Sequence, residues 1–167
     1  MGYRLDQVKE DAIYDWTVSS LGAGVNVIWD KPGEERPEKP YATLNIIGGP
    51  SLVGDRAEHK YKTLDTWEYN FVKKFTLSMN IYADNNHLNL MQKIINGTFL
   101  ETKLQILQLK GLACWGYDGP ADLSALIETE WEFRSHIDIF MSYAETVADI
   151  PGEIQKIELN GIDIEIP

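Results

Sequence analysis

The chain has 167 residues, enough for one domain with a hydrophobic core and too few for two of ordinary size, so we expect a single domain over residues 1–167. Its 26 acidic and 15 basic residues give a formal net charge of −11, which argues against tight binding to nucleic acid. Cys114 is the single cysteine, which excludes an intrachain disulfide and fits a reducing cytoplasm. The sequence has neither the apolar core of a signal peptide nor an apolar run of membrane-spanning length, so we expect neither secretion nor membrane insertion.

The first forty residues predict a helix, a short strand and a loop. Apolar residues recur every three or four positions between Arg4 and Ser20, which is typical of an amphipathic helix. Three prolines with alternating charges over residues 30–40 exclude regular structure and predict an exposed loop. The expected elements are a helix carrying Leu5, Val8, Ala12, Ile13 and Trp16, a strand at Val25–Trp29, the loop 30–40, and a strand at Tyr41–Ile47 that Gly48-Gly49-Pro50 stops.

Two stretches alternate between apolar and polar residues, the first of them strictly, as half-buried strands do. The first is Lys74–Asp84, and the arms of a long polar hairpin, residues 56–71, lead into it. The second lies within Ala125–Tyr143. Their expected buried sides are Phe75, Leu77, Met79, Ile81 and Ala83 for the first, and Trp131, Phe133, Ile137, Ile139, Met141 and Tyr143 for the second.

The remaining segments complete an α/β fold of the α+β type. We predict a mixed, mainly antiparallel sheet with helices packed on it and an extended β-hairpin. The further elements are a helix capped by Asn85 and Asn86 and interrupted at Gly97, a second helix around Leu104–Leu107 ended by Gly111, a strand at Leu112–Tyr117, a turn at Gly119-Pro120, and a C-terminal hairpin over residues 153–166 with its turn at Asn160-Gly161.

No motif for catalysis is complete. The glycine spacing of Gly49–Gly54 resembles a phosphate loop, but Asp55-Arg56 stands where that motif needs a lysine followed by a hydroxyl. His59, His87 and His136 are scattered without metal-ligand spacing. The tryptophans fit core or interface packing. We therefore expect no enzyme activity, no metal and no cofactor, with a small hydrolase as a remote alternative.

Several segments together resemble the phage neck and tail terminator protein family. Their order and spacing are more specific than any one of them, and the resemblance covers most of the chain from about Trp16 to Gly161. Some members of that family have a proline where Phe133 stands here. The matching segments are Arg36–Leu44, the alternating strand before Asp84, Asp122–Arg134, Ser135–Tyr143 and Ile154–Gly161.

The resemblance implies a structural protein of the virion, assembled in the host cytoplasm. It implies a ring, expected to be a hexamer, that caps the tail tube, stops its polymerisation and offers a surface to the neck or connector protein, with the last sheath ring as a further contact in contractile tails. DNA would only pass through the lumen. An alternative is another head–tail connector or tail-completion protein without length-terminating activity. The residues we expect at subunit or partner interfaces are Arg36, Tyr41, Lys60, Lys62, Trp67, Tyr69, Lys73, Arg134 and His136.

Overall fold

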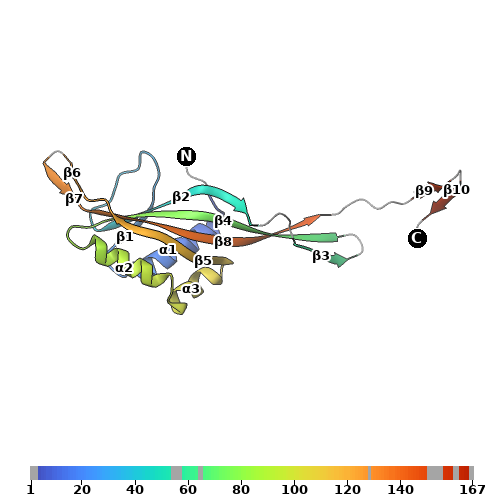
Figure 1. The fold of residues 1–167 in the computed structure, drawn as a ribbon, viewed down its shortest axis with the longest axis horizontal. Helices are drawn as coiled ribbons and strands as arrows, with labels where there is room; N and C mark the ends of the chain where they lie inside the picture. Colours follow the sequence, from blue (N-terminus) through green and yellow to red (C-terminus); the bar gives the residue numbers. More distant parts are fainter. Residues whose placement is uncertain are drawn as a thin grey trace.

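The computed structural model describes residues 4–53, 58–63, 66–127, 129–149, 156–159 and 162–165, with side chains for 4–53, 67–127 and 129–149. Its main feature is a twisted sheet with three helices on one face (Figure 1). The sheet order is β1 (Asn26–Trp29), β2 (Tyr41–Leu52), β4 (Thr66–Tyr82), β8 (Arg134–Asp149) and β5 (Leu112–Asp122), with β3 (Glu58–Thr63) beside the start of β4. Among the described strands of this sheet, β1 and β2 alone pair in parallel, and the other pairs are antiparallel. The predicted α+β fold is confirmed.

The helices lie close to their predicted positions. Helix α1 (Gln7–Leu21) is capped by Asp6, whose side chain accepts the Lys9 backbone N–H at 3.0 Å. Helix α2 (His87–Gly97) begins after Asn86 as predicted, although the Asn86 side chain accepts a hydrogen bond from the Asn89 side chain and makes none to the helix backbone. Helix α3 (Glu101–Gln108) completes the layer.

The hydrophobic core lies between these helices and the sheet. The predicted alternation of the central strand is confirmed, because Phe75, Leu77, Met79 and Ile81 are all buried on the helix side of β4. Ile137, Ile139 and Met141 of β8 lie beside them. At the contact between helices, Gly97 passes so close to α1 that an added Cβ would lie 2.5 Å from the Ser20 hydroxyl oxygen.

Two predicted strand ends were wrong. Strand β2 does not stop at Gly48-Gly49-Pro50 but continues to Leu52 through a register shift, and Gly48 takes the positive φ of 68° that this irregularity requires. Likewise β5 runs through the expected turn at Gly119-Pro120 with a second shift. In the described sheet, β1 ends before it reaches Pro50 of β2, and Pro120 lies on the edge strand β5. Each proline therefore lies where one side of its strand has no neighbouring strand, so the missing backbone N–H costs no hydrogen bond on that side.

The second alternating stretch is also interrupted. Trp131 belongs to β7 (Glu130–Glu132), which pairs with β6 (Ala125–Ile127) in a small separate hairpin, and its side chain is 58% exposed. Phe133 separates this hairpin from β8, so the expected burial of Trp131 in the main sheet is wrong. Val8 is exposed too, although the helix pattern placed it on the buried side of α1.

Both of the longer predicted hairpins exist. Strand β3 pairs with Thr66–Asn70 of β4, and β9 (Lys156–Leu159) pairs with β10 (Ile162–Glu165) as a separate two-stranded sheet. The expected turn at Asn160-Gly161 lies outside the described residues. The segment 30–40 contains no helix or strand and is mostly exposed, so the predicted loop is confirmed.

Candidate interaction surfaces

The face of the sheet opposite the helices carries a cluster of aromatic and cationic side chains around Tyr82. Tyr41 stacks on the Tyr82 ring at a centroid distance of 4.6 Å. Arg36 donates a 3.1 Å hydrogen bond to the Tyr82 hydroxyl and lies over its ring, and Arg134 lies over the same ring from β8. Hydrogen bonding with Tyr41 and then with Tyr82 raises the pKa of Arg36, so its charge is fixed at any physiological pH.

Three of the residues expected at interfaces therefore meet in this cluster, although they come from distant parts of the chain. Tyr41 is only 5% exposed, so its main contacts are inside the subunit. Arg36 is exposed and Arg134 is half-buried. The Arg36 guanidinium, 3.8 Å from Asp30 Oδ1, is the most exposed part of the cluster, whereas Arg134 Nε is buried with no hydrogen-bond partner among the described residues.

His136 lies further along β8 on the same face. Its Nδ1 is 3.1 Å from the Asn80 side-chain oxygen, and its Nε2 is 3.2 Å from Asp138 Oδ1. Both ring nitrogens thus have polar neighbours within the sheet. The His136 side chain is half-buried in a polar band of the uncovered face.

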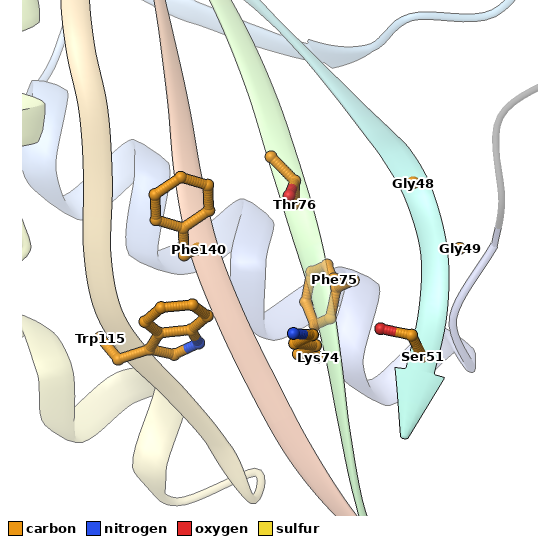
Figure 2. Close-up of a pocket in the computed structure, with 8 residues that line it drawn as sticks. All are labelled: Gly48, Gly49, Ser51, Lys74, Phe75, Thr76, Trp115 and Phe140. Atoms are coloured by element: carbon orange, nitrogen blue, oxygen red, sulfur yellow. The ribbon is translucent and has the colours of Figure 1, made fainter. Parts of the chain in front are cut away.

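A shallow hollow occupies the other end of this face, where sequence reasoning identified no site. It encloses about 240 Å³ and is lined by Gly48, Gly49, Ser51, Lys74, Phe75, Thr76, Trp115 and Phe140. Figure 2 shows the rings of Trp115 and Phe140 at one side of the hollow, with Lys74 and Ser51 at the other. The two rings stack at 5.2 Å, and Trp115 remains 59% exposed.

The irregularity in β5 creates this aromatic wall. Cys114 pairs with Met141 and Gly116 with Phe140, so Trp115 is the extra residue of a bulge and turns to the uncovered face. Cys114 is half-buried beneath it, and burial raises the pKa of its thiol.

Most of the remaining interface candidates lie on the extension of the sheet beyond the helices, where β3 pairs with Thr66–Asn70 of β4 (Figure 1). Trp67 and Tyr69 are half-buried there. Lys73 lies three residues further along β4, between Leu52 of β2 and Tyr143 of β8. It forms an ion pair with Glu145 across the strands, which raises the pKa of the lysine. Lys60 and Lys62 belong to β3, and their side chains lie outside the described set.

The β6–β7 hairpin presents a second surface that the sequence did not reveal. Leu126 and Trp131 are cross-strand partners, and both are 58% exposed; Ile127 is 52% exposed. Glu130 is exposed beside them. A protruding hairpin with three large exposed apolar side chains is unusual on a surface that contacts only water.

The structure also brings together His87, Asp122 and Ser124, which no local spacing predicted. His87 Nε2 is 3.3 Å from Asp122 Oδ1 and 3.4 Å from Ser124 Oγ. In a hydrolase relay the acid holds one imidazole nitrogen while the other faces the nucleophile. Here the acid and the hydroxyl face the same nitrogen, and Ser124 donates a 2.6 Å hydrogen bond directly to Asp122.

This cluster stabilises the loop between β5 and β6. The Ser124 hydroxyl and then its backbone N–H donate to Asp122 and lower the pKa of that carboxyl. The same hydroxyl accepts the Arg134 N–H at 3.2 Å, which ties the loop to the start of β8. The arrangement fits a structural network better than a nucleophile with its base.

In the described part of the chain, no group of three or more His, Cys, Asp or Glu side chains is placed to hold a metal ion. None of the described helices is both long and apolar enough to cross a membrane.

The described surfaces thus offer exposed apolar and charged side chains on an α+β fold. A family model described as phage neck terminator protein matches residues 9–166. The chain belongs to this family, which makes it a structural protein of the phage neck and tail and places it in the virion. No curated protein matches the chain.

Proposed function

We propose that the protein caps the end of the phage tail tube as a ring, ends tube polymerisation and provides the surface on which the neck or connector protein docks. The observation that carries the proposal is the family match over residues 9–166. Its partners are further copies of itself, expected to number six, the tube protein and the neck protein. In a contractile tail the last sheath ring is an additional contact.

The arrangement of surfaces supports a ring. A tube end repeats one subunit surface around an axis, so a cap needs one face for the tube and different lateral surfaces for its neighbours. The uncovered sheet face, the β6–β7 hairpin and the sheet extension supply distinct surfaces on one subunit. The guanidinium groups of Arg36 and Arg134, at the opposite end of this face from the hollow, are our candidates for contact with a partner other than a ring neighbour.

The charge supports a lumen through which DNA passes. Tight binding of a phosphate backbone depends on clustered lysine and arginine that release counterions. With 15 basic against 26 acidic residues, the protein repels phosphate overall and would not hold DNA moving through the ring. No cofactor and no enzymatic step are needed for capping, and we expect assembly in the host cytoplasm.

A polymerisation assay tests the proposal. Tube protein of the same phage is assembled with increasing amounts of this chain, and tube lengths are measured by electron microscopy. We expect shorter tubes as the protein is added, whereas an unrelated acidic protein of similar size leaves the lengths unchanged. Deletion of its gene should give over-long tails or tails that never join heads. Unchanged lengths, together with tails of normal length that fail to attach to heads, would replace capping by a pure connector role.

A further inference from the structure

The hollow beside Lys74 has the character of a docking site for side chains. Its volume of about 240 Å³ is below the roughly 300–1,000 Å³ typical of small-molecule pockets. Ile47 and Val72 are exposed near it on the same sheet face, so the apolar surface extends beyond the Trp115–Phe140 stack.

Lys74 gives this apolar surface a positive centre. The lysine is exposed and makes no ion pair with any described residue, unlike its neighbour Lys73, which is paired with Glu145. An occupant that combines apolar side chains with a carboxylate would therefore satisfy both properties of the hollow.

The β6–β7 hairpin has this complementary character. Leu126, Ile127 and Trp131 supply exposed apolar groups. Glu130 is exposed at the same tip and has no ion-pair partner among the described side chains, and Glu132 follows two residues later. An exposed carboxylate next to large apolar side chains matches an exposed ammonium next to an aromatic stack.

A subunit cannot place its own hairpin in its own hollow. The hairpin precedes Arg134, where β8 begins, whereas Phe140 of the hollow lies six residues further along that strand, or roughly 20 Å. In Figure 1 the hairpin projects from one end of the sheet, and the end of β2 that borders the hollow lies towards the other end. Complementary patches at two separate places on one chain produce head-to-tail contacts, which close into rings when the rotation permits.

We infer that the β6–β7 hairpin of one subunit docks into the Lys74–Trp115–Phe140 hollow of the next copy, with Glu130 facing Lys74. This inference rests on the proposed ring and identifies the pair of surfaces that closes it. The occupant of the hollow is a second copy of this chain.

Charge reversal tests the pairing. Lys74→Glu and Glu130→Lys each place like charges together, so each should raise the concentration needed for half-maximal tube shortening by about tenfold. The double variant keeps the net charge of −11 and should restore capping to near the wild-type level. The matched control is Glu101→Lys with Lys110→Glu, an equivalent exchange of exposed charges at the ends of α3, which should change little. Melting temperatures verify that all variants fold.

Disulfide cross-linking supplies a second readout that does not depend on capping. In a Cys114→Ser background, Ser51→Cys at the hollow and Thr129→Cys at the hairpin should together give a ladder of covalent oligomers on oxidation, while each cysteine alone gives no ladder. Cross-links to the tube protein would identify the wrong occupant and overturn the inference.

The two proposals fail in different ways. If the wild type caps tubes but no ladder forms and the charge reversals have no effect, this pairing is wrong and the capping function stands. If the wild type leaves tube lengths unchanged, the capping function is wrong, and the ladder in concentrated protein without tubes then decides the pairing alone.

Discussion

Leu77→Ala measures how far stability depends on the contact between the helices and the central strand. Leu77 is 0% exposed and lies between Ile46 of β2 and Ile139 of β8. The substitution removes about three methylene equivalents at roughly 0.8 kcal/mol each, or about 2.4 kcal/mol of transfer free energy. Strands on both sides prevent the site from collapsing, so a cavity contribution should bring the total loss to about 3–5 kcal/mol.

The assay is urea unfolding followed by tryptophan fluorescence, and Thr76→Ala is the matched control. Thr76 is the adjacent residue of β4 but lies half-buried on the uncovered face, so its truncation should cost much less. The slope of free energy against urea should stay constant, which shows that the midpoint shift reports stability. The unfolding midpoint should be the same at two protein concentrations, which excludes a contribution from self-association. A loss for Leu77→Ala no larger than that for Thr76→Ala would refute the placement of the core.

Three further predictions concern chemistry and binding. Because burial raises the pKa of Cys114, its alkylation by iodoacetamide at neutral pH should be slower than that of a free cysteine and should accelerate as pH rises; rapid reaction would contradict the burial. Ser124→Ala should raise the pKa of Asp122 towards its ordinary value, which carboxyl NMR shifts can follow. A lowered pKa in the folded state stabilises the protein fully above the unfolded-state pKa, and this stabilisation is lost as the pH falls through the folded-state pKa. The substitution should therefore cost less stability at acid pH than at neutral pH. Filter binding at low salt should detect only weak association with duplex DNA, and sub-micromolar affinity would contradict a lumen that lets DNA pass.

The central layer of the fold could be predicted because its residues are buried on one side only. The alternation of Phe75 to Ala83 follows directly from a strand with helices on one face and none described on the other. The helices could be placed for the same reason, since their apolar spacing records the face that packs on the sheet. Periodicity indicates that a face is buried, but it does not show which neighbouring strand or helix covers it.

The missed boundaries depend on strand pairing, which the local sequence does not contain. Pro50 and Pro120 normally interrupt strands, yet both are tolerated where one side of the strand has no partner in the described sheet. Trp131 continues the alternation of β8 in sequence, but its strand pairs with Leu126 in a separate hairpin and not with β4. A pattern of period two cannot distinguish these two pairings.

The surfaces were harder to predict than the core. Arg36, Tyr41 and Arg134 were selected from sequence, but their convergence on Tyr82 arises from strand register. The hollow at Trp115 depends on a bulge that places an extra residue on the uncovered face. The hairpin had no distinguishing signal, because Glu130-Trp131-Glu132 continues the alternation of a half-buried strand.

The most direct test of the account is electron microscopy of tail tubes assembled with saturating protein. We predict additional density at one end of each tube only, as a ring with the rotational symmetry of the tube itself, and free ends on tubes assembled without it. Protein bound along the tube wall or at both ends, or tubes with bare ends in the presence of folded protein, would contradict the proposal that this chain caps the tail.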